Sequence, residues 1–246
     1  MSASQRSQLI DGLRASAVIA MIIYHFGWDL GEFGFLDRIK VNSGYWKIFA
    51  QSVGVSFLFI SGVSFWMSVS RGINAYKFIL RLSVLLAAAM SVTLGTYIFA
   101  GESFVFFGIL HLLAACSIFG LLVFRFPPWV LFLLVAFLII MPQYFSSAFF
   151  EPRYLSWTGL YNSFTGSVDF YGFMPWSAAY ILGLAFAKSI VKHRLGSVWT
   201  SSGIFIGNTN TFFERGFFWI GRNSLFVYIV HQPILIGAIY CFQRFV

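Results

Sequence analysis

The stretch IFAQSVGVSFLFISGVSFWMSVS, residues Ile48–Ser70, contains no Asp, Glu, Lys or Arg. A helix needs roughly 20 consecutive apolar residues to cross the hydrocarbon core of a bilayer, and this stretch exceeds that length. Because no water is present there to bond exposed backbone groups, the chain must satisfy each N–H and C=O internally, as a helix does. The stretch therefore predicts a transmembrane helix.

Other uncharged runs occur along the chain, most of them of similar length: Ala15–Trp28, Leu82–Gly101, Ser103–Phe124, Phe126–Phe150, Phe170–Ala187 and Asn223–Gln243. The 246 residues are 59% hydrophobic and 10% charged, with a mean hydropathy of +0.82, unlike a soluble domain. The alternating segments of a membrane barrel are absent from the sequence. We therefore predict an all-α membrane protein, a single bundle of about seven transmembrane helices over residues 1–246, with the first helix beginning near Leu9.

Basic residues are distributed unequally between the two sets of predicted loops. If the N-terminus is cytoplasmic, ten Lys and Arg residues fall in inner loops and five in outer loops, with Arg14 inside the first helix. Inner loops of membrane proteins carry the excess of Lys and Arg, so we expect the N-terminus inside and the C-terminus outside. The net charge of +8 then reflects topology, and no segment has the basic face with interleaved aromatics that nucleic acid binding needs.

Two further features concern the loops and the cysteines. The segment GSVWTSSGIFIGNTNTFFERGFFWIGRN, residues 196–223, is polar in its first half and aromatic and basic in its second, which predicts a position along the cytoplasmic interface. Cys116 and Cys241 lie inside predicted helices and indicate neither a disulfide framework nor a metal site.

The first predicted helix carries polar residues that a membrane disfavours. Each charge at a helix centre costs roughly 2.5–3.5 kcal/mol, so such groups usually face a cavity or a partner. At about 100° per residue, one stripe roughly 80° wide contains Asp11, Arg14, Val18, Ile22, His25 and Asp29. One edge therefore carries Asp11 and Arg14 near the inner end and His25 and Asp29 near the outer end. These residues either form a functional site or are two pairs whose members satisfy each other.

Other candidates lie on later helices. Lys77 and Arg81 share a face of the third helix, and together with Arg14 and Arg222 they predict a cationic inner vestibule suited to phosphates. The alternative is the ordinary excess of Lys and Arg in inner loops, although Arg14 and Arg81 lie further into their predicted spans than topology requires. His111, in the string FGILH, is expected at a depth similar to that of His25.

The last predicted helix also carries polar residues on one face. Ser224, Tyr228 and His231 share that face, and Pro233 removes the amide that would bond the carbonyl of Ile229. His231 either lines a site or bonds the backbone that the proline leaves free.

Four segments resemble the heparan-α-glucosaminide N-acetyltransferase catalytic-domain family, within the wider group of transmembrane acyltransferases. They are IDGLRASAVIAMIIYHFGWDL (Ile10–Leu30), FGILHLLAACS (Phe107–Ser117), SVDFYGFMPWSAAYILGLAFA (Ser167–Ala187) and WIGRNSLFVYIVHQPILIG (Trp219–Gly237), in the family's order. Two departures occur. Ala15 follows Leu-Arg where the family usually has glycine, and NSGYWKIFAQ lacks the histidine that the animal lysosomal enzymes carry there.

The resemblance implies acyl transfer from cytoplasmic acyl-CoA, acetyl-CoA above all, to an amine or hydroxyl of an acceptor, often a sugar, reached from the outer face. The membrane implied is the bacterial inner membrane. By analogy with histidine-bearing first helices of related acyltransferases, neutral His25, oriented by Asp29 or Asp169, is expected to act as general base. An acyl-histidine intermediate is the alternative. His111 is expected to donate to the oxyanion or to contact the acceptor.

The residues expected to bind the coenzyme or line its channel are Arg14, Lys77, Arg81, Arg222, Asn223, Tyr228 and His231. The expected partners are acyl-CoA, a sugar-like acceptor and membrane lipids. Neither a metal nor nucleic acid is expected, and the sequence does not decide whether the chain forms an oligomer. The leading alternative is a small-molecule or proton-coupled transporter, for which we find no matching inverted halves. A retinal-binding photoreceptor is excluded because the last helix has no lysine.

Overall fold

A computed structural model describes residues 8–37, 43–163, 166–192 and 211–244. Within these ranges the regular elements are helices, and six are long and apolar enough to cross a membrane. These six are α1 (Gln8–Glu32), α3 (Gly44–Val69), α4 (Ala75–Ala100), α6 (Pro128–Phe145), α8 (Phe173–Lys192) and α11 (Ser224–Gln243). A further apolar helix, α5 (Ile109–Val123), is shorter. The prediction of an all-α polytopic membrane protein is confirmed.

The chain forms two compact units. Unit 1 contains α1, the first part of α3 up to Phe57, α10 (Phe212–Arg222) and α11. Unit 2 runs from Leu58 to the end of α8 and includes the short helices η1 (Gly101–Ser103), η2 (Ala148–Phe150) and α7 (Arg153–Ser156). A single bundle over residues 1–246 stays a prediction.

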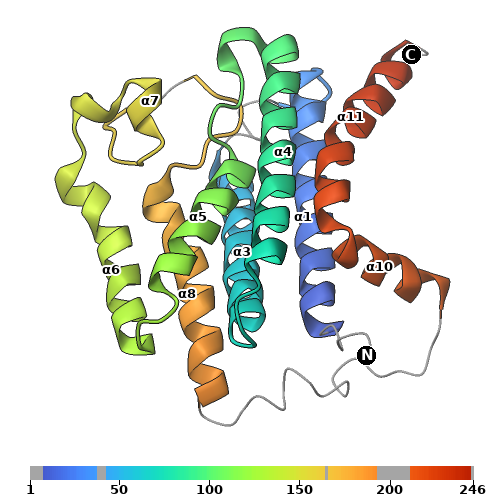
Figure 1. Ribbon diagram of the computed structural model, residues 1–246. Coiled ribbons are helices and arrows are strands. Elements are labelled where there is room, and N and C mark those ends of the chain that lie inside the picture. Colours follow the sequence, from blue (N-terminus) through green and yellow to red (C-terminus); the bar gives the residue numbers. More distant parts are fainter. Residues whose placement is uncertain (1–7, 38–42, 164–165, 193–210, 245–246) are drawn as a thin grey trace. The chain divides into compact units, whose positions relative to one another are not determined.

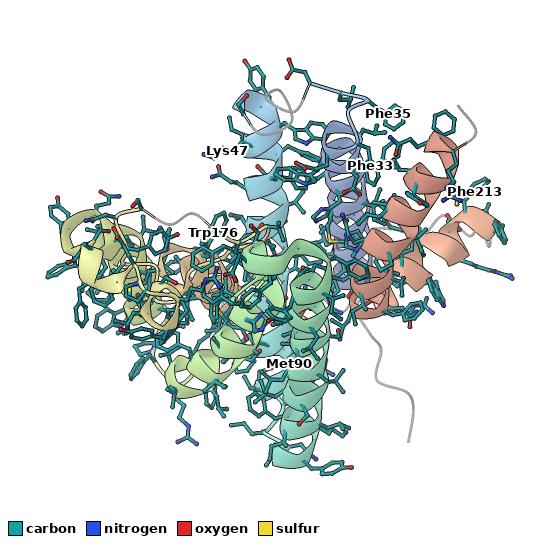
Figure 2. All side chains as sticks on the ribbon, turned by 90° about the horizontal axis from the view of Figure 1, so that it is seen from above. Phe33, Phe35, Lys47, Met90, Trp176 and Phe213 are labelled. Carbon is teal, nitrogen blue, oxygen red and sulfur yellow. The ribbon has the colours of Figure 1, made fainter. Side chains whose placement is uncertain are left out.

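In unit 1, α11 lies beside α1, and α10 runs crosswise near the beginning of α1 (Figure 1). Glycines permit this close packing. A Cβ atom added to Gly221 would lie 1.9 Å from the backbone oxygen of Asp11, so no other residue fits there without movement. Phe213 projects from α10 (Figure 2) and is 85% exposed. An interfacial position for α10 stays a prediction, and residues 193–210 of the preceding connection lie outside the described residues.

In unit 2, α5, α6 and α8 lie side by side (Figure 1), and α3 crosses α8 at two reciprocal glycines. A Cβ atom on Gly62 would lie 1.9 Å from the oxygen of Tyr180, and one on Gly183 would lie 2.1 Å from the oxygen of Phe59. Small residues let membrane helices approach closely and gain dispersion contacts. The crossing is continuous with a buried apolar core that includes Leu58, Leu112, Leu131, Ile181 and Leu184.

The fourth predicted span differs from the observed helix, because α5 begins at Ile109 and not near Ser103. Side chains of α4 hold the preceding segment in an extended form. Thr93 Oγ1 donates to the carbonyl of Val105 (2.7 Å), and the amide of Val105 donates to Thr96 Oγ1 (2.9 Å). These bonds satisfy the backbone of Val105 outside any helix. At about 1.5 Å per residue, α5 is about 22 Å long, less than the roughly 30 Å hydrocarbon core.

The other end of α5 is closed by a basic residue predicted for an inner loop. Lys188 Nζ donates to the carbonyls of Phe124 and Phe126, each at 2.7 Å, and lies 4.9 Å from the centre of the Trp66 ring. The last carbonyls of a helix have no partner within the helix, and a cation near them is favourable. Lys188 therefore joins the ends of α5 and α8.

Candidate functional site

The polar edge of α1 carries an ion-pair cluster near the N-terminal end of this helix, in unit 1. The carboxylate of Asp11 is buried; its Oδ1 lies 3.6 Å from Arg14 Nη1, and its Oδ2 lies 3.8 Å from Arg222 Nε. The pairing of Asp11 with Arg14 that the helical spacing predicts is therefore present, and α10 adds a second guanidinium. Asp11 thus contacts a guanidinium from each of two helices, α1 and α10.

The turn between α10 and α11 places Arg222 in this cluster. Gly221 brings the backbone of α10 against Asp11. Asn223 then ends α10, because both its backbone amide and its side-chain Nδ2 donate to the carbonyl of Trp219 (2.9 Å each). Asn223, predicted from sequence to line the coenzyme channel, thus holds the turn in this structure.

Two histidines lie together near the C-terminal end of the same edge. The rings of His25 on α1 and His231 on α11 have centroids 5.0 Å apart. Tyrosine rings flank them, with Tyr24 5.2 Å from His25 and Tyr228 5.6 Å from His231. The structure therefore brings His25 of α1 together with Tyr228 and His231, which the sequence placed on one face of the last predicted helix.

Asp29, expected from sequence to orient His25, is buried and forms a hydrogen bond with a residue other than His25. Its Oδ1 accepts a hydrogen bond from Gln232 Nε2 at 2.7 Å. Among the described residues, no hydrogen bond joins Asp29 to His25, so the carboxylate links α1 to α11. Asp29 Oδ2 and Gln232 Oε1 are buried and without a hydrogen-bond partner in the described part of the chain.

His231 is oriented by its own helix. Its Nδ1 lies 2.6 Å from the carbonyl oxygen of Tyr228. The sequence suggested that this histidine bonds the carbonyl of Ile229, which Pro233 leaves free; the bonded carbonyl is instead that of the preceding residue. His231 is only 7% exposed, and its Nε2 has no hydrogen-bond partner among the described residues.

The two ends of the α1 edge are separated by apolar packing. Val18 is fully buried in a cluster with Met21 and Val53, against which Ile22 and Tyr228 are packed. Ile22 and Tyr228 are half-buried. Any elongated ligand that touches both ends must therefore pass along or between these side chains.

Unit 2 contains His111, in the first turn of α5. Its Nδ1 accepts from the amide of Gly108 (3.3 Å), so its Nε2 carries the proton when the ring is neutral. That nitrogen lies 3.3 Å from Thr93 Oγ1, whose hydroxyl donates to Val105. Both ring nitrogens of His111 are thus engaged within the protein.

Asp169 meets the same turn of α5 from the loop that precedes α8. Its Oδ2 accepts from the amide of Ile109 at 3.4 Å, where the helix dipole favours a negative charge. Burial nevertheless raises the pKa of Asp169 to about 6, and the bond from Ile109 opposes this shift in part. Asp169 and His111 therefore flank one backbone turn, Gly108–Ile109.

Lys77 and Arg81 are exposed on α4 in unit 2. Asn74 begins this helix, since its Oδ1 accepts from the amide of Lys77 at 2.9 Å. Lys77 and Arg81 are four positions apart, which places both cations on one face of α4, as the spacing predicts.

A family model described as heparan-alpha-glucosaminide N-acetyltransferase, catalytic, matches residues 6–233, nearly the whole chain. The chain belongs to this family. The resemblance based on the four sequence segments is thereby confirmed, and the family indicates a membrane acetyltransferase. No curated protein and no solved structure matched the chain in the corresponding comparisons.

Three residues of this family member were not marked from sequence, although they hold the candidate groups. Gln232 bonds Asp29, Thr93 bonds His111, and Trp46 packs its ring against Gly27. Gln232 carried a usable signal, since an amide inside a span usually has a partner. Thr93 and Trp46 carried none, because both residue types are common in membrane helices.

Proposed function

We propose that this protein transfers an acyl group, acetyl in the simplest case, from cytoplasmic acyl-CoA to an amine or hydroxyl of an acceptor such as a sugar. The observation that carries the proposal is the edge of α1, which has the Asp11–Arg14–Arg222 cluster at one end and the His25–His231 ring pair at the other. Membership of an acetyltransferase family supports the same reaction.

The inner cluster suits the phosphates of a coenzyme. Arginine presents several N–H donors in a fixed plane and bonds phosphate in a bidentate manner. Arg222 is about half exposed, with 55% of its side-chain surface accessible, so a phosphate can approach it while Asp11 keeps it in place. Lys77 and Arg81 belong to unit 2, and their predicted role in binding the coenzyme stays a prediction.

The length of the coenzyme fits the separation of the two ends. At about 1.5 Å per residue along α1, Arg14 and His25 are about 16 Å apart, which is of the order of an extended pantetheine arm. The arm would pass beside Val18, displacing the half-buried side chains of Ile22 and Tyr228. The thioester would then lie near the histidines.

The chemistry at the outer end requires a proton acceptor. As the acceptor nitrogen or oxygen attacks the thioester carbonyl, a neutral imidazole takes its proton, the new C–N or C–O bond forms and the C–S bond breaks. The coenzyme thiolate leaves and receives the proton from the imidazolium. His25 is the base predicted from sequence, and His231 adjoins it. His111 could take part in the reaction only if its Nε2 gave up the hydrogen bond to Thr93 and bonded the substrate instead.

Thermal unfolding of the purified chain in detergent tests the donor assignment. Acetyl-CoA at saturating concentration should raise the unfolding temperature relative to coenzyme-free buffer, because a ligand that binds only the folded state stabilises it. ATP, which shares the adenosine and phosphates but not the thioester arm, is the matched comparison. If no acyl-CoA stabilises the chain, the donor assignment is wrong and a transporter becomes the better hypothesis.

Mass spectrometry of the products tests the reaction. The wild-type chain, given acetyl-CoA and a panel of amino sugars and sugar alcohols, should produce an acetylated compound and free CoA. If His25 is the base, as predicted from sequence, His25→Ala should abolish this transfer while acetyl-CoA still raises the unfolding temperature. Wild-type turnover in His25→Ala would remove His25 from the reacting centre.

A further inference from the structure

The free nitrogen of His231 points to a specific chemical role. A backbone carbonyl can only accept a hydrogen bond, so the contact of 2.6 Å between His231 Nδ1 and the oxygen of Tyr228 fixes the proton on Nδ1. In the neutral ring, Nε2 then carries a lone pair. The tautomer is thus set by the backbone of α11 itself.

Nε2 of His231 is buried, and no described residue donates a hydrogen bond to its lone pair. His231 is 93% buried, and the described part of the chain offers Nε2 no hydrogen-bond donor. An unsatisfied buried polar atom costs about 1–3 kcal/mol, which a fold retains only where something compensates. Two other lone-pair atoms on neighbouring residues, Asp29 Oδ2 and Gln232 Oε1, are buried and unsatisfied too. None of these three atoms receives a hydrogen bond from the residues that the structure describes.

His25 differs from His231 in this respect. The described contacts of His25 are ring contacts, with Tyr24 and with His231, and none of them fixes its tautomer. A general base needs a nitrogen with a free lone pair, and a hydrogen bond at the opposite ring nitrogen fixes the tautomer and orientation of the ring. His231 meets both conditions.

We propose that His231 Nε2 is the atom that takes the proton from the acceptor nucleophile, with His25 binding the acceptor beside it; this assignment rests on the proposed acyl transfer. The acceptor X–H bond breaks as X bonds to the thioester carbon, and the proton moves to Nε2. The C–S bond then breaks, and the imidazolium returns the proton to the coenzyme thiolate. Throughout, Nδ1–H stays bonded to Tyr228.

The assignment predicts different kinetics for the two histidines. His231→Asn keeps an N–H group able to reach the carbonyl of Tyr228 but lacks the second nitrogen. Its kcat should fall by about 100-fold or more, the usual contribution of a general base, while the acceptor KM changes by less than about threefold. His25→Gln, which keeps a polar group without a titratable nitrogen, should chiefly raise the acceptor KM.

The measurements use the full chain in lipid nanodiscs with acetyl-CoA and glucosamine as probes, and they follow CoA release and acetyl-glucosamine. Ile234→Ala, an exposed position on α11, is the control and should behave as wild type. A His231→Asn variant within threefold of the wild-type kcat, or the reverse pattern between the two histidines, would overturn the assignment while leaving acyl transfer intact. No CoA release from the wild type with any amine or hydroxyl acceptor would instead overturn the proposed function and, with it, this assignment.

A readout independent of turnover examines the tautomer. Nitrogen-15 NMR of the histidine-labelled chain, with the His231→Asn spectrum subtracted for assignment, should show His231 protonated at Nδ1 and bare at Nε2. A bare Nδ1 would contradict the proposal whatever the chain catalyses.

Discussion

At the scale of single residues, mutation of Arg222 tests whether this arginine binds the coenzyme or only reflects the topology of the membrane protein. Arg222→Ala leaves Asp11 paired with Arg14 but removes the exposed guanidinium of the cluster. A charge-assisted bond at a partly exposed site is worth about 1 kcal/mol, so we expect acetyl-CoA affinity to fall roughly fivefold. Isothermal titration in detergent measures this affinity.

Arg215→Ala is the matched control, because Arg215 is an exposed arginine on the same helix. Both variants change the net charge equally. If Arg215→Ala weakens acetyl-CoA binding as much as Arg222→Ala does, the cluster contributes only a general positive field and not a phosphate contact.

The pH response of stability is set in part by Asp169. Its folded-state pKa of about 6 lies above the ordinary value of 3.8, so the folded chain binds this proton more tightly than the unfolded chain. The resulting stabilisation is complete below pH 3.8 and is lost as pH rises through about 6.

Asp169→Asn removes this titration and keeps an oxygen that accepts from the amide of Ile109. We therefore expect the unfolding temperature of the wild type to fall relative to Asp169→Asn between about pH 5 and pH 7. Differential scanning fluorimetry at several pH values measures the difference. A constant difference across that range would show that the carboxyl group does not titrate there.

At the scale of helices, the contact of α10 with α1 is expected to control the coenzyme end. Gly221→Ala places a methyl group 1.9 Å from the Asp11 oxygen, so α10 must move and carry Arg222 with it. Acetyl-CoA affinity should fall at least as far as in Arg222→Ala, although no charge is lost. Gly216→Ala on the same helix, where a Cβ meets nothing within 4 Å, should leave affinity unchanged. Equal effects of the two glycine variants would refute the role of the contact.

The crossing of α3 with α8 is expected to be a main source of stability in unit 2. Gly62→Ala forces a methyl group against the backbone of Tyr180, and such overpacking costs about 1–3 kcal/mol. Gly95→Ala on α4 meets nothing within 4 Å and should be neutral or slightly stabilising, since alanine favours a helix over glycine. The unfolding temperatures of both variants, measured in the same detergent, test this expectation. If both variants change the unfolding temperature to a similar extent, the α3–α8 crossing is not a main source of stability.

At the scale of the whole molecule, the topology depends on whether the short α5 spans the membrane. Six long spans alone would place both termini on one side, whereas α5 as a seventh span places the C-terminus outside. The inner excess of Lys and Arg favours the second arrangement. A C-terminal alkaline phosphatase fusion should therefore be active outside the cytoplasm, and a C-terminal green fluorescent protein should not fluoresce. The opposite result would make the number of spans even.

The helices could be predicted from the sequence because hydrophobic length alone selects a spanning helix in lipid. The uncharged runs located α1, α3, α4, α6, α8 and α11, and the 100° rotation per residue placed Asp11 beside Arg14. The uncharged run Ser103–Phe124 did not locate the start of α5, which begins at Ile109. Apolar composition does not reveal that two threonines of α4 bond the backbone of Val105 and hold it outside a helix.

The sequence by itself determined the membrane class, the helical composition, the family and the polar edge of the first helix, since each depends on residues near one another along the chain. Only the tertiary structure decided that Asp11 holds Arg222, that Asp29 bonds Gln232, and that the rings of His231 and His25 adjoin. It also left Nε2 of His231 without a hydrogen bond from any described residue. These pairings join residues about 200 positions apart. Their geometry depends on how closely Gly221 and α11 approach α1, and helix periodicity carries no information about that distance.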